Sequence, residues 1–335
     1  MKKRYIELHL HLDGAITPDI AKDLAALQKI KLPYKDEREL EKALMVSKDC
    51  RSLNEFLECF KLPCSLLQTK EGIARAVYLV QENIKRQGVV YAEIRFAPQL
   101  HMDKGLTMRE VIESALDGLK KSDLKCNLIL CCMRMADNKE QNLETVKLAK
   151  EYLINEESSE DYGVVALDLA GAEALYKTEQ FIDVFKLANE LNVPFTIHAG
   201  EADGAESVKK AVEFGAKRIG HGVRSVENLA LMKALSEKKI CLEMCPTSNL
   251  QTKAIEKIED FPIREFMKLG IPVTINTDDM AICGTDMGHE MNLIRNKFDI
   301  TDNEESEIYA NAVRYSFAKN KIKKQLMEVQ YWQKK

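Results

Sequence analysis

The chain has 335 residues, of which 45% are hydrophobic and 30% are charged, and its formal net charge is −4. This size and composition are typical of a soluble globular protein. Its charged residues are scattered along the chain, which argues against a basic surface for nucleic acid and a polybasic patch for a membrane. We therefore expect a small molecule as the partner, with no nucleic acid and no membrane.

Both the N-terminus and the cysteines favour a cytoplasmic protein. Residues 1–4 lead directly into an alternating pattern, without the apolar stretch of a signal peptide. No later apolar run approaches the roughly 18 residues that span a bilayer. The nine cysteines lack CxxC spacing, which favours reduced thiols over disulfides or a thiolate metal site. The sequence does not specify the oligomeric state and is compatible with a monomer.

Short β-branched, apolar runs alternate with stretches of helical spacing along the whole chain. The predicted strands cover residues 5–11, 89–97, 126–133, 163–170, 193–199, 217–221, 239–245 and 271–277. Between them, Thr107 and Thr178 are predicted to cap helices, and Gly215 and Gly270 to end them. Eight strand–helix units predict an α/β protein with a (β/α)8 TIM barrel, a fold of roughly 250 residues or more.

The connection after the first predicted strand is too long for one helix. Residues 17–87 contain several helical patterns, which begin at Thr17 and again at Ser52. No Pro-, Gly- or Ser-rich linker separates this segment from its neighbours. We therefore predict a single domain over residues 1–335, with a helical insertion at about 17–87 on the face where barrels carry their active sites.

Histidines and carboxylates collect at the C-terminal ends of the predicted strands, where barrel enzymes carry their chemistry. His9 and His11 end the first strand, and alternation along a strand points both side chains the same way. The later strands end at Asp168 and Gly171, at His198 and Glu201, at His221, at the sequence CPTSN, and at Asp278 and Asp279. With His101 and His289 in loops, all six histidines of the chain map to one rim.

Histidine and carboxylate suit a borderline divalent metal such as zinc. A His-x-His pair by itself is more often an ordinary strand pair than a metal site. Here other strand ends agree with it, because the first and eighth strands are neighbours in a closed barrel and the fifth strand adds another histidine. We expect a metal site formed by His9, His11, His198 and Asp278, with Asp168 as a hydrogen-bonded support.

The ordered motifs HLHLDGA, DLAG, HAGE, RIGHG, CPTSN and INTDD resemble those of the adenosine deaminase family, a branch of the metal-dependent amidohydrolases. They cover essentially the whole chain. The resemblance implies one Zn²⁺ per chain at the mouth of the barrel, held by the four residues named above. It also implies hydrolytic deamination of adenosine and 2′-deoxyadenosine to inosine, or 2′-deoxyinosine, and ammonia, a reaction of purine salvage.

The same resemblance implies two catalytic residues. Glu201 delivers a proton to purine N1, which requires a protonated carboxyl group at the moment of transfer. His221 orients the attacking water and helps to deprotonate it. Outside this resemblance, Glu201 has the alternative of capping the helix after the fifth strand.

The implied substrate-binding residues are His11, Asp13, Gly171 and Asp279. A protonated Asp279 faces purine N7, because N7 only accepts hydrogen bonds. The N–H group of Gly171 reaches N3, and Asp13 contacts the ribose hydroxyls. Two simpler interpretations stay open: Asp13 and Gly14 as an ordinary turn, and Gly171 as a bend.

Four other functions stay open, two of them within the same family. Adenine deaminases and N6-methyl-AMP deaminases share the zinc residues, but the resemblance suggests Glu or Asn in them at the position of Asp13, so Asp13 favours a nucleoside with a free 5′-hydroxyl. A dinuclear amidohydrolase needs a bridging Lys or Glu on the fourth strand, which offers only Asp168. A catalytically silent nucleoside-binding relative should lack one of the metal ligands, or Glu201, or His221.

Met280 stands where the family commonly has proline, which leaves substrate affinity open.

Overall fold

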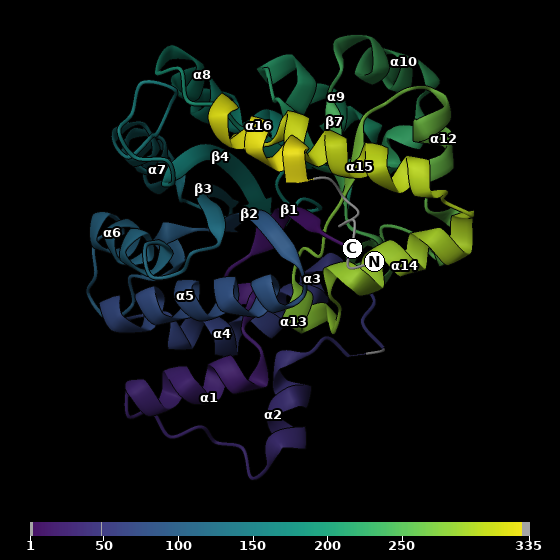
Figure 1. Cartoon of the computed structure of the whole chain (residues 1–335). Helices are drawn as coiled ribbons and strands as arrows, with labels where there is room; N and C mark the ends of the chain where they lie inside the picture. Colours follow the sequence, from purple (N-terminus) through teal and green to yellow (C-terminus); the bar gives the residue numbers. More distant parts are fainter. Residues whose placement is uncertain (1–2, 48, 330–335) are drawn as a thin grey trace.

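The computed structural model describes residues 3–47 and 49–329, in which parallel strands and helices alternate (Figure 1). The strands are β1 (Tyr5–His11), β2 (Val89–Phe96), β3 (Lys125–Arg134), β4 (Val164–Gly171), β5 (Thr196–Ala199), β6 (Arg218–His221), β7 (Cys241–Met244) and β8 (Val273–Ile275).

The α-helices are α1 (Pro18–Leu27), α2 (Glu37–Leu44), α3 (Leu53–Leu57), α4 (Lys61–Leu66), α5 (Lys70–Arg86), α6 (Met108–Leu119), α7 (Lys139–Glu151), α8 (Ile182–Glu190), α9 (Ala205–Phe214), α10 (Leu229–Lys238), α11 (Pro246–Gln251), α12 (Ile263–Lys268), α13 (Met280–Cys283), α14 (Met287–Phe298), α15 (Asp302–Tyr315) and α16 (Asn320–Val329). Short 3₁₀ turns are η1 (Asp13–Ala15), η2 (Glu58–Phe60), η3 (Pro98–Leu100), η4 (Thr178–Phe181), η5 (Val223–Glu227) and η6 (Ile258–Asp260). None of the described helices is both long and apolar enough to cross a membrane.

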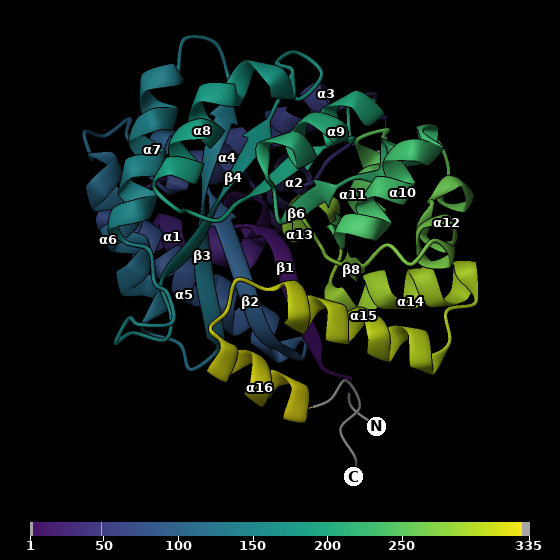
Figure 2. The same ribbon diagram turned by 90° about the horizontal axis from the view of Figure 1, so that it is seen from above.

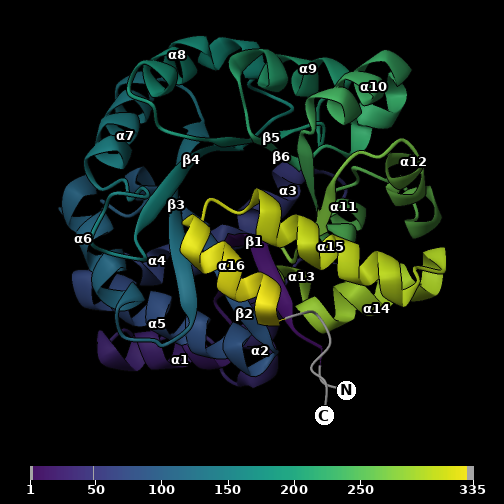
Figure 3. The same cartoon turned by 45° about the horizontal axis from the view of Figure 1, so that its top comes forward.

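The strands form two parallel sheets, β1 to β4 and β5 to β8, which meet at two seams. At one seam Leu167 N donates to Pro194 O over 2.9 Å. At the other, His11 N donates to Asp278 O over 2.9 Å, and Asp278 N donates to His9 O over 2.8 Å. The described strands therefore follow one another around the predicted α/β barrel, with helices around them (Figure 3).

Predicted and observed elements agree best in the first half of the chain, and the later strands are shorter than predicted. The last one covers only Val273–Ile275.

Thr107 forms a capping box with Glu110, as predicted. The prediction for Thr178 was wrong: its hydroxyl bonds the Ser207 hydroxyl and a buried arginine, while the turn η4 precedes the helix. Because the buried hydroxyl of Thr178 is used in these tertiary hydrogen bonds, it does not cap the backbone N–H groups at the start of the helix.

The connection between β1 and β2 contains α1 to α5, as the helical pattern predicted. Thr17 caps α1 by accepting a hydrogen bond from Ile20 N, and Pro18 takes the first helical position. α1 and α2 lie away from the barrel, below α5 in Figure 1. α3 and η2 instead bring apolar side chains to the candidate site.

α15 packs against β8 and β1, and α16 lies across the first strands (Figures 2 and 3). Arg218, inside the barrel, donates to Tyr315 O over 3.1 Å, and Glu93 accepts a hydrogen bond from Phe317 N over 2.5 Å. The segment between the two helices thus closes the end of the barrel opposite the site.

We expect Gly118→Ala to destabilise the protein. Gly118 lies in α6 where it crosses α5, and a Cβ there would overlap with Ala74 O. Alanine favours a helix by about 1 kcal/mol over glycine, but overpacking costs about 1–3 kcal/mol. Thermal unfolding should show a fall of a few degrees.

The control is Asp117→Ala, at an exposed position of the same helix, which we expect to leave the melting temperature nearly unchanged. A Gly118→Ala variant as stable as the parent would contradict the close helix crossing.

Candidate active site

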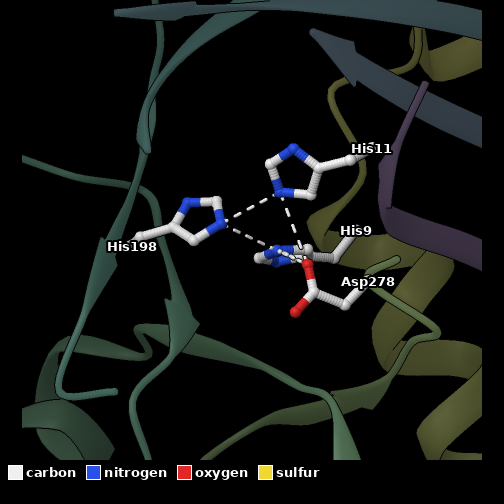
Figure 4. A group of neighbouring side chains, drawn as sticks. All are labelled: His9, His11, His198 and Asp278. Atoms are coloured by element: carbon white, nitrogen blue, oxygen red, sulfur yellow. Dashed lines mark hydrogen bonds and ion pairs between the residues drawn. The ribbon is translucent and has the colours of Figure 1, made fainter. Parts of the chain in front are cut away.

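Four side chains converge at the C-terminal end of the barrel: His9, His11, His198 and Asp278 (Figure 4). The Nε2 atom of His198 lies 3.0 Å from that of His9 and 3.1 Å from that of His11. Asp278 Oδ1 lies 3.1 Å from His9 Nε2 and 3.4 Å from His11 Nε2. Four atoms that bind one zinc tetrahedrally at about 2.0–2.1 Å lie about 3.3 Å apart. The spacing therefore fits one shared metal ion.

The local backbone explains why these groups meet. Alternation along β1 turns His9 and His11 inward, while Leu8 and Leu10 are fully buried in the apolar core. The seam hydrogen bonds place Asp278 beside both histidines. Asp278 has a φ of 61°, a left-handed conformation that is uncommon outside glycine and is found at functional sites.

In two of the histidines, the ring nitrogen that points away from the metal site, Nδ1, faces a carboxylate. His9 Nδ1 lies 2.7 Å from Glu243 Oε2, and His198 Nδ1 lies 2.9 Å from Asp168 Oδ2. A carboxylate accepts hydrogen bonds, so it favours the tautomer with the proton on Nδ1. The two Nε2 lone pairs then face each other at 3.0 Å, an arrangement that a cation between them stabilises. The donor set thus fits a divalent metal.

Buried arginines hold these carboxylates ionised. Arg95 donates to Asp168 over 2.7 Å and to Glu243 over 2.8 Å, and Arg218 donates to the other oxygen of Glu243. Burial opposes ionisation of Asp168, but His198 and Arg95 hold its pKa well below the usual range. Arg95 and Arg218 do the same for the pKa of Glu243 against its burial. Asp168 is therefore an ionised carboxylate that faces the imidazole of His198.

Glu201 and His221 lie beside the four metal-site residues. Burial raises the pKa of Glu201 to about 8, and the negative charges of Asp278 and Glu173 add to the effect. Its Oε2 lies 3.6 Å from His221 Nε2. Glu201 does not cap the following helix, because Gly204 is the N-cap of α9. This carboxyl group therefore keeps its proton to a higher pH than an exposed glutamate does.

A neighbouring amide determines the tautomer of His221. Asn249 Nδ2 lies 2.9 Å from His221 Nδ1, and an amide nitrogen only donates, so Nε2 carries the imidazole proton. Burial holds the pKa of His221 well below its usual value; the nearby His9 and His198 lower it further, and the negative charge of Asp278 opposes them. His221 also has a positive φ, of 61°. It therefore presents a neutral imidazole to the site.

Asp279 and Asp13 have raised pKa values for the same main reason. Burial raises the pKa of Asp279 well above its usual value, and Asp278 and Asp13 add to it. Asp279 Oδ1 is buried and has no hydrogen-bond partner among the described residues. Burial also raises the pKa of Asp13 to about 6. A side chain at Gly14 would overlap with the Asp279 carboxyl group, so glycine is required between these two acids.

Two adjoining cavities connect these groups. A small one, about 40 Å³, is lined by His11, Glu201, His221, Asp279 and Gly171. A larger one, about 540 Å³, has His11, Asp13 and Gly171 in its wall together with mostly apolar side chains. Gly171 ends β4 with a φ of 101°, which only glycine adopts readily.

The structure thus brings together the residues that the motifs singled out: the four metal-site residues, and around them Glu201, His221, Asp13, Gly171 and Asp279. His101 and His289 do not join them. His101 is fully buried, and burial lowers its pKa to about 4. The prediction that His289 lies in a loop was wrong: it lies in α14, and its side chain is exposed there.

Sequence reasoning missed Glu243, Arg95 and Arg218, and it placed Asn249 at a strand end only as part of the motif CPTSN. A signal existed for two of them, since Arg95 and Glu243 stand inside apolar strands, whereas Arg218 is the first residue of β6. Lys, Glu, Arg and Asp are rarely fully buried unless paired, so such a position points to a buried partner. Which strands supply the partners is not visible in the sequence.

Known proteins are similar to this chain along its length. The family model described as "Adenosine deaminase" matches residues 5–331. An adenosine deaminase of Haemophilus ducreyi is 46% identical over 327 residues, which cover 96% of this chain and 94% of that protein. An adenosine deaminase of Clostridium botulinum is 40% identical over 326 residues, 96% of this chain and 95% of that protein.

A solved structure of similar fold is adenine deaminase from Arthrobacter aurescens. It has a TM-score of 0.87 and 26% identity, and the match covers 97% of each chain. Another is N6-methyl-AMP deaminase from Arabidopsis thaliana, with a TM-score of 0.82 and 25% identity over 98% of this chain and 96% of that one. The sequence relatives named adenosine deaminase are thus more similar than either of these structures.

We expect Asp168→Asn to weaken zinc binding by about 10–100-fold, as loss of a group that orients a ligand typically does. The variant loses the negative charge that faces His198 Nδ1. Competition with a chromophoric chelator measures the affinity. Asp183→Asn, at an exposed ion pair with Lys139, is the control. Equal zinc affinity of the Asp168→Asn variant and the parent would contradict this supporting role.

Proposed function

The chain belongs to the adenosine deaminase family, and from this membership we propose that it is a zinc-dependent enzyme that hydrolyses adenosine and 2′-deoxyadenosine to inosine or 2′-deoxyinosine and ammonia. The observation that carries the proposal is one pocket that holds a metal donor set together with two carboxyl groups, those of Glu201 and Asp279, whose pKa values are raised. We further propose a cytoplasmic role in purine salvage, as a monomer or a larger assembly.

His9, His11, His198 and Asp278 would hold one zinc ion per chain. When bound, zinc lowers the pKa of a water ligand and so supplies a nucleophile near neutral pH. Glu201 donates a proton to purine N1, which makes C6 more electrophilic. The neutral His221 orients the water and stabilises charge with its Nε2 proton. Because Nε2 is already protonated, it does not take the water's proton, which differs from the role that the resemblance implied.

The remaining polar groups fit a purine nucleoside. Protonated Asp279 offers a donor to N7, and its unpartnered Oδ1 is available for that contact. The Gly171 N–H would approach N3, while Asp13 and His11 face the larger cavity, where the sugar would lie. A carboxyl group at this position favours ribose hydroxyls over phosphate, because an ionised Asp13 would repel a phosphate.

Met280 replaces the proline that the family commonly has, and the turn forms with it. Met280 is the first residue of α13, where the N–H group needs no helical partner. Cys283 N donates to Asp279 O over 2.8 Å, and Thr285 N donates to Met280 O over 2.9 Å. These bonds support Asp279 in its place.

We expect the purified, zinc-loaded enzyme to deaminate adenosine and 2′-deoxyadenosine but not adenine or AMP. The ultraviolet change on conversion to the hypoxanthine ring measures each rate, and a chelator should abolish turnover. Turnover confined to adenine or to N6-methyl-AMP would select the alternative within the family. A zinc-loaded sample with no turnover of any of these would instead indicate a silent nucleoside-binding protein.

Glu201→Gln should retain zinc and lose about 10²–10⁴-fold in kcat, the range that a general acid contributes. Metal analysis and initial rates test this together. Glu206→Gln, an exposed pair with Lys209 in the next helix, should behave as the parent does. Loss of zinc from the Glu201→Gln variant would show that Glu201 serves the metal and is not the acid.

We expect the rate of the parent enzyme to fall as the pH rises toward 8. Glu201 acts in its protonated form, and burial raises its pKa to about 8, so the active form is lost as pH passes through that value. A bound divalent cation favours the ionised carboxylate, so the midpoint should lie at or below pH 8. A kcat/KM profile of the zinc-loaded enzyme that stays level through pH 9 would contradict this role.

A further inference from the structure

The loop of residues 200–203, which carries Glu201, is held by a buried carboxylate that lines neither cavity of the site. Glu173 lies two residues after β4 and is 1% exposed. Its Oε1 accepts hydrogen bonds from Gly200 N over 2.8 Å and from Ser207 Oγ. Its Oε2 accepts from the backbone N–H groups of Glu201, Ala202 and Asp203 over 3.0, 2.7 and 3.1 Å.

Successive backbone N–H groups that point to one centre form an anion-binding nest. Here the anion is supplied by the chain itself, from the connection after the neighbouring strand. Hydrogen bonds to an ionised carboxylate are stronger than those between neutral groups. Buried amide donors without an acceptor are unfavourable, so the loop conformation depends on the Glu173 carboxylate.

A second group holds the strand that leads into the loop. The buried Arg134 donates to His198 O over 2.7 Å and to Thr178 Oγ1 over 2.9 Å. Thr178 in turn bonds Ser207, which donates to Glu173. The segment from His198 to residue 203 is thus held by a cation at its start and an anion at its end, and two hydroxyls link the two.

We propose that Glu173 is a positioning residue for deamination: it holds the 200–203 loop so that the Glu201 carboxyl group faces the site. The inference rests on the proposed function. Glu173 does not line either cavity of the site, so it acts from behind the loop, through its hydrogen bonds to the Glu201 backbone and its neighbours and through the negative charge that adds to the raised pKa of Glu201. Its removal should affect the chemical step more than substrate binding.

The test is Glu173→Gln in the full-length, zinc-loaded enzyme. Glutamine has nearly the same volume, but its NH₂ group faces N–H donors and carries no charge. We expect kcat for adenosine to fall at least tenfold, with KM within about threefold of the parent and zinc content unchanged. The control is again Glu206→Gln, which changes a nearby exposed acid.

A double-mutant cycle separates positioning from general damage. If Glu173 acts through Glu201, Glu173→Gln should have little further effect on kcat when Glu201 is already glutamine. Equal fold losses in both backgrounds, loss of zinc, or a parent-like kcat for Glu173→Gln would overturn the proposal.

The activity of the parent enzyme and a second variant, Ser207→Ala, separate the possible outcomes. An inactive parent enzyme would contradict the proposed function itself, whereas an active parent with an unaffected Glu173→Gln variant contradicts only the positioning role. If Glu173→Gln does not fold, the cycle is run with Ser207→Ala, which removes one of the five hydrogen bonds to Glu173. We expect a two- to fivefold kcat loss that disappears in the Glu201→Gln background, and its persistence there would overturn the proposal.

Discussion

Two arginines buried inside the barrel constrain the groups above them. An arginine does not lose its proton in a protein, so Arg95 and Arg218 require buried carboxylates as partners. Asp168 and Glu243 fill this role, and the same two carboxylates face the outer nitrogens of His198 and His9. The orientation of the metal-site histidines therefore depends on charge balance deeper in the barrel.

The seam between the two sheets imposes a second constraint. Asp278 exchanges backbone hydrogen bonds with the β1 strand at His9 and His11 while its own φ is positive. The hydrogen bonds that join the two sheets at this seam therefore also bring Asp278 to the two histidines of the donor set. The next residue, Asp279, fits only because Gly14 has no side chain, so the segments that follow β1 and β8 pack against each other at the cavities.

The prediction from sequence succeeded where the signal was local or ordered along the chain. Strand ends that carry His9, His11, His198 and Asp278 were identified because a parallel barrel collects them at one rim. Thr178 shows the limit: a capping residue by pattern, it bonds Ser207 and Arg134 instead. Propensity describes a helix end in isolation, and tertiary partners of a buried hydroxyl override it.

The sequence by itself determined the alternation of strands and helices, the family, and the side chains that can bind a metal or move a proton, since these depend on residue type and spacing. Only the tertiary structure decided which groups hold those side chains. Glu243 lies 234 residues from His9 and Asp168 lies 30 from His198 in the chain, and Glu173 meets the Glu201 loop from another strand connection. Such pairs follow from the closure of the barrel, which brings distant segments into contact and removes the water that would otherwise satisfy their charges.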